Sequence, residues 1–427
     1  MKRLARNLVA AILATLARAI LLKYRPGIVM ITGSVGKTST KDAIASVVSK
    51  NFFSRASEKS YNSEFGVPLT IIGAKNPWSH PVRWLKVFQD ALALIMLPSH
   101  YPKLLVLEVG ADSPGDLDRI LQIATPDIVV VTRLPELPVH VEAYATPNAV
   151  REEEFTPAYA LDAGSPLIVS ADDPYAREMA KPLPVRVITY GFEDDAEIHI
   201  SDPRVLIEDG KPVGMEALLI IQGESYPLQV RGALGRQQLY SPAAAVAVAL
   251  SLSMTIEEAL AAITGYVPPP GRSRILKGKD GSVLIDDSYN SSPAAVEEAL
   301  TSLALVKGKR RIAVLGDMLE LGRYSMREHE RVGAFAAGAV DMVVAVGPRA
   351  RAIADAAHSA GMEEGKALFF ADSKEAAAAL PALIGAGDVV LVKGSQSIRT
   401  ERIVEALLED AADQDKLVRQ DREWKSR

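Results

Sequence analysis

The segment from residue 28 to residue 42 constrains the fold more than any other part of the chain. An apolar run rich in β-branched residues, Ile28 to Ile31, leads into a glycine-rich turn, and a helical pattern opens at Lys37. A strand, a glycine loop and a helix N-terminus together hold a phosphate chain, because backbone N–H groups and the positive helix end face the anion. Only two residues separate Gly33 from Gly36, whereas the usual phosphate loop has four. We still predict nucleotide phosphate binding here, with ATP as the ligand and a plain glycine turn as the alternative.

Each residue of this loop has an expected task. In phosphate loops the lysine reaches the terminal phosphates and a hydroxyl lies on Mg²⁺, which here indicates Lys37 and Thr38. The full set of expected nucleotide contacts in the loop is Gly33, Ser34, Val35, Gly36, Lys37, Thr38 and Ser39.

Composition limits the class of protein. A chain of 427 residues is too long for one core, so two or three domains are expected. The net charge of −5 argues against nucleic acid as a partner. The absence of cysteine excludes disulfides, thiol catalysis and cysteine-based zinc sites, and it fits a cytoplasmic protein.

Residues 1–26 predict an amphipathic helix. At 100° per residue, Arg3, Arg6, Asn7, Arg18 and Arg25 form one stripe, and Leu8, Ile12, Leu13, Leu16 and Ile20 form the opposite one. The arginines disfavour a membrane-spanning helix. Two interpretations stay open: the helix packs on its own domain, or it makes a peripheral contact with the inner face of the membrane.

The remaining chain alternates apolar strands with amphipathic helices, which predicts an α/β protein. Residues 27–267 are expected to form a central, P-loop ATPase-like domain with a mostly parallel sheet. The proline run at 268–270 marks a linker, and residues 268–410 predict a Rossmann-like C-terminal domain. Residues 196–231 are expected to form an antiparallel flap, and residues 411–427 a charged tail that frays.

Polar residues at the ends of predicted strands are further candidates, because α/β sheets bind ligands there. Glu108 closes an apolar strand, and we predict that it binds Mg²⁺ together with Thr38. His140 follows a later strand on a proline-flanked loop; a lone histidine is more often structural than functional. Asp286 and Asp287 end the first strand of the second α/β unit and are candidates for ribose or phosphate-linked contacts.

Several motifs now indicate a family. They occur in chain order as Thr-Gly-Ser-Val-Gly-Lys-Thr-Ser-Thr-Lys (32–41), Asn-Ser-Glu-Phe-Gly-Val-Pro-Leu-Thr (62–70), Leu-Glu-Val-Gly-Ala (107–111), Ala-Asp-Asp (171–173), Gly-Arg-Ser-Arg (271–274), Ile-Asp-Asp-Ser-Tyr-Asn-Ser-Ser-Pro (285–293), Leu-Gly-Asp-Met-Leu-Glu-Leu-Gly (315–322) and Val-Lys-Gly-Ser (392–395), with His329 downstream of the seventh. With this set the chain resembles the Mur ligase family, and within it the branch that adds D-alanyl-D-alanine to UDP-N-acetylmuramoyl-tripeptide. The resemblance covers residues 27 to about 405.

This resemblance implies ATP-driven amide bond formation through an acyl-phosphate, in the synthesis of cell-wall peptidoglycan precursors. The implied partners are a muramoyl-peptide precursor and an amino acid or dipeptide. The implied roles follow the motifs: Lys37 on the β- and γ-phosphates, Thr38 and Glu108 on one Mg²⁺, and His140 on a second. Arg272 would reach ATP from the inter-domain hinge, and Asp287 would bind ribose or order that hinge. The remaining implied residues are on the substrate side: Asn62, Asp317 and Lys393.

The chain also departs from the family pattern. The family's carbamylated lysine, fourteen positions after the metal-binding histidine, is Glu154 here, which keeps a negative charge on a shorter stem. Glu154 is therefore expected to act as a catalytic and metal-binding group. The family's Gly-x-His-x-x-x-Asn reads with Gln237 and Ser241 at its two polar positions, which puts the adenine contacts in doubt.

The largest departure concerns the sugar-nucleotide module. Only 26 residues precede the Gly-loop strand, so the family's N-terminal UDP-sugar-binding domain is expected to be absent. The insert at 78–102 carries Trp84, Phe88, Leu92, Ile95, Met96 and Leu97, which indicates core filling more than lipid contact. Two alternatives to the D-alanyl-D-alanine ligase remain: a related amide ligase with another acceptor, such as a folate or a storage peptide, and a nucleotide-binding scaffold without catalysis.

Overall fold

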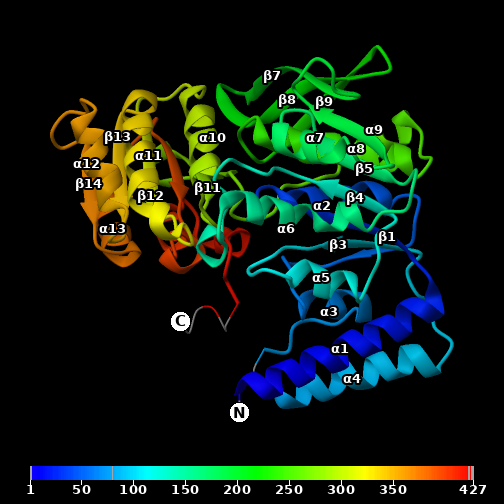
Figure 1. Ribbon diagram of the computed structural model, residues 1–427. Helices are drawn as coiled ribbons and strands as arrows, with labels where there is room; N and C mark the ends of the chain where they lie inside the picture. The colour runs from blue at the N-terminus through cyan, green and yellow to red at the C-terminus, as the bar shows by residue number, and fades with distance from the viewer. Residues whose placement is uncertain (1, 79, 422–423, 425–427) are drawn as a thin grey trace. The chain divides into compact units, whose positions relative to one another are not determined.

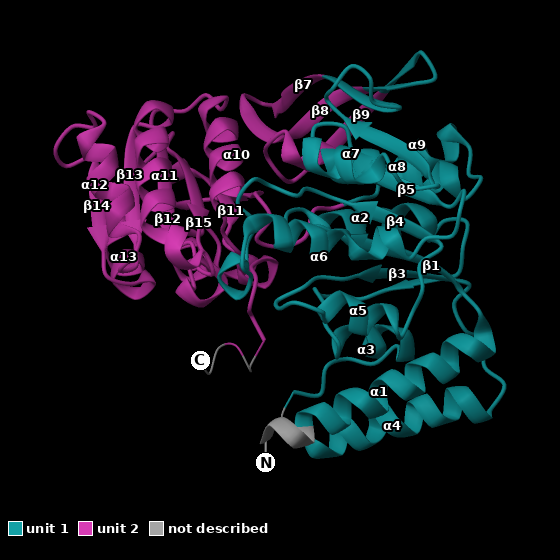
Figure 2. Ribbon diagram, viewed as in Figure 1, with its two compact units in different colours: residues 1–201, 219–226, 240–266 teal, residues 202–218, 227–239, 267–427 magenta. Residues whose placement is uncertain are grey.

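A computed structural model describes residues 2–78, 80–421 and 424. The chain divides into two compact units, which Figure 2 colours separately. Unit 1 consists of residues 1–201, 219–226 and 240–266, and unit 2 of residues 202–218, 227–239 and 267–427. The boundary between the units passes through the three consecutive strands in residues 198–231.

Unit 1 is built on a parallel sheet in the order β2-β3-β1-β4-β5-β6. These strands are β1 (Gly27–Thr32), β2 (Ser54–Ala56), β3 (Leu104–Glu108), β4 (Ile128–Val131), β5 (Pro166–Ser170) and β6 (Arg186–Gly191). β3 and β4 are buried along their whole length, as expected for strands covered on both faces. Because the strands are parallel, their carboxyl ends meet at one edge, where β1 ends at Thr32 and β3 at Glu108.

Helices cover both faces of this sheet (Figure 1). Those of unit 1 are α1 (Lys2–Tyr24), α2 (Lys37–Val48), α3 (Gly66–Ile72), α4 (Pro81–Met96), α5 (Asp116–Leu121), α6 (Pro147–Tyr159), α7 (Pro174–Ala180) and α9 (Ile256–Ile263). One core joins alternate strand residues such as Met30 and Leu107 to Leu13 of α1 and Phe155 of α6. α2 packs against β1, β2 and β3 and against α9. α8 (Gln237–Ser251) begins in unit 2 and continues in unit 1.

Three long strands extend the sheet order beyond β6: β7 (Ile198–Glu208), β8 (Lys211–Ile221) and β9 (Glu224–Arg231). Two-residue connections join them, and Asp209, Gly210, Gln222 and Gly223 all have positive φ. Such connections make tight hairpins whose strands are antiparallel. The flap expected for residues 196–231 is therefore present.

The second sheet lies in unit 2 and has the order β10-β11-β15-β12-β13-β14. Its strands are β10 (Arg274–Lys277), β11 (Val283–Asp287), β12 (Arg311–Gly316), β13 (Met342–Val346), β14 (Ala367–Phe370) and β15 (Val389–Lys393). All neighbours are parallel except β10 and β11. The helices are α10 (Pro293–Ala304), α11 (Ser325–Ala339), α12 (Arg351–Ser359), α13 (Ser373–Ala379) and α14 (Glu401–Leu407), and short 3₁₀ turns include η1 (Val141–Ala143) in unit 1 and η6 (Ala411–Lys416) here. This is the predicted Rossmann-like arrangement.

Two expectations about the ends of the chain need correction. The buried side of α1 is Leu13, Ala17 and Ile20, whereas Leu8 is 62% exposed although it was assigned to the apolar stripe. The predicted stripe is correct for Leu13, Leu16 and Ile20 and wrong for Leu8 and Ile12, because the side that packs on the core includes the small Ala17. The tail does not fray where it is described, since Leu417 and Val418 are buried after η6. Arg3 lies among the residues whose side chains are outside the described part.

The expectation that the insert at 78–102 fills the core is correct only in part. Its helix α4 buries Val87 and Ala91 and packs Trp84, Phe88 and Ile95 against the core of unit 1. Leu92, Met96 and Leu97 are exposed, because they lie on the opposite side of α4.

Candidate active site

The loop between β1 and α2 has the backbone that its two glycines predict. Gly33 and Gly36 have φ of +114° and +91°, a conformation that side chains with a Cβ rarely adopt. A Cβ on Gly33 would also lie 2.4 Å from Thr132 Oγ1. The Ser34 N–H donates to the carbonyl of Arg133 over 2.8 Å, which anchors the loop to the segment after β4. Gly36 is the N-cap of α2, so the first helical N–H groups open toward the loop.

Lys37 and Glu154 meet beside this loop. Lys37 Nζ lies 3.4 Å from Glu154 Oε1 and donates to the carbonyl of Gly33. The other oxygen of Glu154 accepts from Thr32 Oγ1 at 2.9 Å and from the Gly33 N–H at 3.2 Å. Glu154 is only 1% exposed, so its charge is held by these donors instead of by water. α6 therefore places the Glu154 carboxylate beside the phosphate loop, where it pairs with the ammonium group of Lys37.

Thr38 and Glu108 form the predicted pair at the ends of α2 and β3. Thr38 Oγ1 donates to Glu108 Oε1 at 3.1 Å, and Ser60 Oγ donates to the same oxygen. Glu108 is 2% exposed, and its second oxygen, Oε2, is buried without a hydrogen-bond partner among the described residues. A buried carboxylate oxygen without a donor is costly, and a cation would relieve that cost.

This donor set fits Mg²⁺. The ion is usually held by one or two carboxylates together with water and substrate phosphates, and a hydroxyl is an acceptable oxygen ligand. Within the described residues no group of three or more His, Asp and Glu side chains could hold a metal by itself. Thr38 and Glu108 would hold the ion, which would supply positive charge for the phosphate oxygens when bound.

Asn62 also reaches this site. Its carbonyl accepts from the Gly110 N–H at 3.0 Å. A Cβ added to Gly110 would lie 3.0 Å from Asn62 Nδ2 and 3.3 Å from Lys37 Nζ. The amide of Asn62 and the ammonium of Lys37 thus approach the same point, which only glycine leaves open. A role of Asn62 in positioning the substrate stays a prediction.

His140 has a different partner from Glu154. It has a φ of +63° at the start of η1, and its Nε2 lies 3.6 Å from Asp112 Oδ1. Tyr144 follows η1, and its buried hydroxyl has no hydrogen-bond partner in the described part of the chain. Burial, and next the carboxylates of Glu153 and Glu154, raise the pKa of Tyr144, so the phenol is a neutral donor. A shared metal site of His140 and Glu154 stays a prediction.

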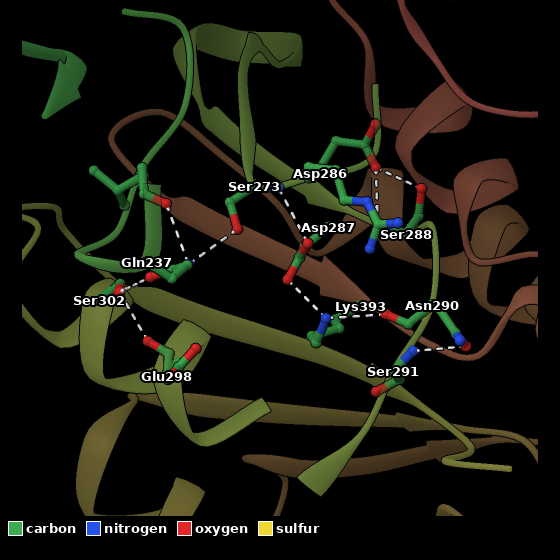
Figure 3. Close-up of polar contacts among 12 residues, drawn as sticks. Gln237, Ser273, Asp286, Asp287, Ser288, Asn290, Ser291, Glu298, Ser302 and Lys393 are labelled. Carbon is green, nitrogen blue, oxygen red and sulfur yellow. Dashed lines mark hydrogen bonds and ion pairs between the residues drawn. The ribbon is translucent and has the colours of Figure 1, made fainter. Parts of the chain in front are cut away.

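In unit 2, Asp286 and Asp287 end β11 with different environments. Asp287 accepts from the Ser273 N–H at 3.1 Å and pairs with Lys393 Nζ at 2.8 Å, while Lys393 also donates to the carbonyl of Asn290 (Figure 3). Asp286 is fully buried; one oxygen accepts from Ser288, and the other has no described partner. Burial raises the pKa of Asp286 to about 6. Asp287 and Lys393 are thus neutralised by each other.

Arg272 contacts the aromatic ring of Tyr289, and the tail of the chain in turn contacts the backbone of Tyr289. The guanidinium of Arg272 lies 3.9 Å from the ring centre of Tyr289. Arg419 of the tail donates to the carbonyls of Ser288 and Tyr289 and pairs with Glu401 at 2.8 Å. A Cβ on Gly271 would lie 2.7 Å from Val418 Cγ1, so the tail lies directly against the hinge segment. The tail therefore fixes the backbone that supports Arg272.

Gln237 and Ser241 are both hydrogen-bonded. They occupy the two polar positions at which the chain departs from the family's Gly-x-His-x-x-x-Asn pattern. Gln237 Nε2 donates to Ser273 Oγ at 3.3 Å, and Gln237 Oε1 accepts from Ser302 Oγ at 3.2 Å (Figure 3). Ser241 is buried in unit 1, where its hydroxyl lies 3.1 Å from Thr40 Oγ1 of α2. Both side chains therefore have structural contacts that do not need a nucleotide.

Asp317 is buried and its contacts are structural. Its Oδ1 accepts from the Ala350 N–H at 2.7 Å, and burial raises its pKa. His329 accepts from the Met318 N–H at 3.0 Å, and burial lowers its pKa, so the imidazole is neutral. These contacts fix the turn after β12. A substrate contact of Asp317 stays a prediction.

Four site residues were missed: Lys41, Ser60, Tyr144 and Arg419. Lys41 is fully buried and its Nζ donates to the carbonyl of Ser57 at 2.6 Å, which holds the loop that carries Ser60 and leads to Asn62. Lys41 is the last residue of the motif at 32–41, but the resemblance assigned it no role. Tyr144 lies only four residues after His140 but belongs to no quoted motif, and Arg419 reaches Ser288 across 131 residues.

A parallel sheet, a glycine loop at a helix N-terminus, a lysine and a hydroxyl–carboxylate pair define the class of P-loop-like nucleotide-binding α/β proteins. The Mur ligase middle domain matches residues 31–249, and the Mur ligase glutamate ligase domain matches residues 271–396. The chain belongs to the Mur ligase family.

Relatives and solved structures agree with this assignment. The UDP-N-acetylmuramoyl-tripeptide–D-alanyl-D-alanine ligase of Mycobacterium tuberculosis is 30% identical, over 94% of this chain and 77% of that protein. The Bacillus subtilis ligase of the same name is 25% identical, over 93% and 79%. The crystal structure of MurF ligase from Thermotoga maritima in complex with ADP has a TM-score of 0.76 at 25% identity and covers 93% of this chain and 83% of that one.

Proposed function

We propose that the chain is an ATP-dependent ligase that adds D-alanyl-D-alanine, or a similar amine, to a muramoyl-peptide in peptidoglycan precursor synthesis. The observation that carries this proposal is the convergence of Lys37, Thr38, Glu108 and Asn62 at one strand edge, in a chain whose curated relatives are ligases of this kind. The proposed functional division places the nucleotide in residues 27–267 and the C-terminal ligase part in residues 268–410, which the two family matches support.

In the proposed reaction the terminal carboxylate of the acceptor attacks the γ-phosphate of ATP, and ADP leaves. The amine of D-alanyl-D-alanine then attacks the acyl carbon of the acyl-phosphate, and inorganic phosphate leaves. Lys37 would neutralise the β- and γ-phosphate oxygens, and Asn62 would orient the group beside them. Mg²⁺ on Thr38 and Glu108 would supply charge neutralisation, and His140 is the proposed ligand for a second ion.

The residues of unit 2 have proposed roles on the other substrates. Arg272 would contact ATP, and Asp287 would bind ribose or order the hinge; its ion pair with Lys393 favours ordering. Asp317 and Lys393 are proposed on the side of the amine substrate. The scaffold alternative rests on the replacements at Glu154, Gln237 and Ser241, whereas the presence of Lys37, Thr38, Glu108 and His140 favours a working enzyme.

Glu154 replaces a carbamylated lysine in this proposal, so carbon dioxide is not needed. Ligase activity should not change when bicarbonate is added or removed. Glu154→Lys should either lose activity or become dependent on bicarbonate. A rise of wild-type activity with bicarbonate would contradict this role of Glu154, because another lysine would then have to be modified.

The test of the reaction is ADP release with purified full-length chain, ATP and Mg²⁺. Release should require both the acceptor and D-alanyl-D-alanine, and it should stop when either is omitted. Three acceptors should be compared: the free tripeptide, UDP-muramoyl-tripeptide and a lipid-linked muramoyl-peptide. Their order of activity shows which carrier of the muramoyl-peptide the enzyme accepts. Activity only with glutamate and a folate would favour the alternative acceptor.

For the location of the enzyme we propose the cytoplasm, with a peripheral contact to the inner face of the membrane through residues 1–26. The segment Arg6–Tyr24 is long and apolar enough to cross a membrane by length and composition, and much of it is exposed. However, Leu13, Ala17 and Ile20 pack in the core of unit 1, which favours a helix that lies along a surface.

A further inference from the structure

Helices α1 and α4 carry a concentration of exposed apolar side chains. The exposed apolar residues on α1, on α4 and directly after it are Leu8, Ile12, Leu22, Val82, Leu85, Leu92, Met96 and Leu97. These eight are almost half of the seventeen large apolar side chains that are exposed in the described part of the chain. Soluble proteins rarely leave such a concentration uncovered unless it binds a partner or a membrane.

The two helices form one outer layer of unit 1. They pack against each other and against α3, and Figure 1 shows them side by side on the outside of the unit. Lys23 Nζ at the end of α1 donates to the carbonyls of Leu94 and Leu97, at 2.8 and 2.6 Å, so the carboxyl ends of both helices meet. The inner sides are occupied, by Leu13 and Ile20 of α1 and by Val87 of α4. The exposed apolar residues therefore lie on the sides that face away from the core.

The charge of this layer is opposite to that of the whole chain. Among its described side chains, Arg6, Arg18, Lys23, Arg83 and Lys86 are basic, and Asp90 is acidic, which gives +4. The chain as a whole carries −5. Next to the end of α1 is a groove of about 300 Å³ that Arg18 and Arg25 line together with mainly apolar residues, and Arg18 Nε donates to the carbonyl of Gln122 at 2.6 Å. Basic groups beside exposed apolar groups are complementary to anionic headgroups above acyl chains.

We propose that the outer side of α1 and α4 is a docking surface for an anionic lipid bilayer. The helices lie in the plane of the interface, the exposed leucines and Met96 enter the acyl boundary, and the groove between Arg18 and Arg25 accepts a lipid phosphate. This inference rests on the peripheral contact proposed above and adds α4 and the headgroup groove to it. It does not depend on which amide bond the enzyme forms.

The arrangement differs from a spanning helix in a testable way. A spanning α1 would have to leave Leu13, Ala17 and Ile20, each fully buried, and uncover the core of unit 1. A peripheral layer leaves those contacts intact. An alkaline carbonate wash should therefore release the protein from vesicles, and a protein that resists the wash would overturn the peripheral arrangement.

The decisive experiment is vesicle sedimentation of the full-length chain. Vesicles of phosphatidylcholine with phosphatidylglycerol are compared with vesicles of phosphatidylcholine alone, at low and moderate salt. Leu85→Gln/Met96→Gln should weaken binding to the anionic vesicles at least tenfold. The matched control is Leu305→Gln/Met326→Gln, which removes two apolar side chains of similar exposure from unit 2 and should bind like the parent.

Each result decides the proposal. No sedimentation of the parent with anionic vesicles, or equal binding by the two double variants, overturns it. If light scattering instead shows a dimer that Leu85→Gln/Met96→Gln disrupts, without vesicle binding, the surface belongs to a second copy of the chain. ADP release by every protein without vesicles is recorded in parallel, so a failure of the ligase proposal is seen separately. Thermal unfolding shows that each variant is folded.

Discussion

Glu108 at the end of β3 in unit 1 and Asp287 at the end of β11 in unit 2 differ in how their buried negative charge is balanced. Glu108 is almost fully buried and accepts only from hydroxyl groups in the described chain, and one of its oxygens has no partner. Asp287 and Glu401 are buried as well, but each has a cation at 2.8 Å, Lys393 and Arg419. The first arrangement is incomplete without a cation from outside, whereas the second is complete in the free protein. We infer that unit 1 binds the reacting phosphates and that the paired groups of unit 2 position their neighbours.

Lys37→Ala should have the largest effect on activity. It removes the ammonium group that neutralises the phosphates, and we expect turnover to fall by about 10³-fold or more. Steady-state ADP release with both substrates measures this effect. Lys50→Ala, at an exposed position just after α2, is the matched control and should retain parental activity. A Lys37→Ala protein with normal turnover would remove this residue from the mechanism.

Glu108→Gln tests the contrast between Glu108 and the paired Asp287, because it removes the negative charge of Glu108 and keeps the size of the side chain. We expect the concentration of Mg²⁺ needed for half-maximal activity to rise by about 10- to 100-fold. Thermal stability without Mg²⁺ should not fall, since a buried carboxylate with an unpartnered oxygen is lost. If stability falls while the Mg²⁺ requirement is unchanged, Glu108 has a structural role only. Asp118→Asn, an exposed carboxylate on α5, serves as the control.

Arg419→Ala should raise the KM for ATP by roughly tenfold with a smaller change in kcat, because the support beneath Tyr289 and Arg272 is lost. Breaking the buried pair with Glu401 should also cost about 3–5 kcal/mol of unfolding free energy. Arg419→Lys keeps the charge but not the two-pronged contact, so it should recover stability more than the KM. Lys416→Ala, in the exposed part of the tail, is the control. Equal losses of kcat and stability with a normal KM would contradict the positioning role.

Asp286 should affect the pH dependence of stability more than activity. Burial raises its pKa from 3.8 to about 6 in the folded protein, so folding favours the protonated form. Its contribution to stability is full below pH 3.8 and is lost as the pH rises through about 6, a change of roughly 3 kcal/mol. Asp286→Asn should therefore become more stable relative to the parent between pH 5 and pH 7.5 in urea titrations. A constant difference between the two proteins over this range would show that Asp286 does not titrate there.

The local parts of the site could be predicted from sequence because they lie within a few residues of one another. The strand, the two glycines, Lys37 and the start of α2 form one continuous segment, and the alternation of apolar runs predicted the α/β class. Glu108 could be named because it ends a strand whose place in a parallel sheet is determined by topology. Asn62 was named only through the family resemblance. The hairpins of residues 198–231 followed from their Asp-Gly and Gln-Gly turns.

Other features depend on contacts between distant segments, and only the tertiary structure decided them. Glu154 reaches Thr32 and Lys37 from more than a hundred residues away, and Arg419 reaches Ser288 over a similar separation. The buried side of α1 depended on which neighbour it packs against, since Ala17 and the larger Leu13 and Ile20 share one side while Leu8 is left outside. Periodicity determines that a helix is amphipathic. The surface that covers it is determined by the fold, because burial depends on neighbours that the local sequence does not contain.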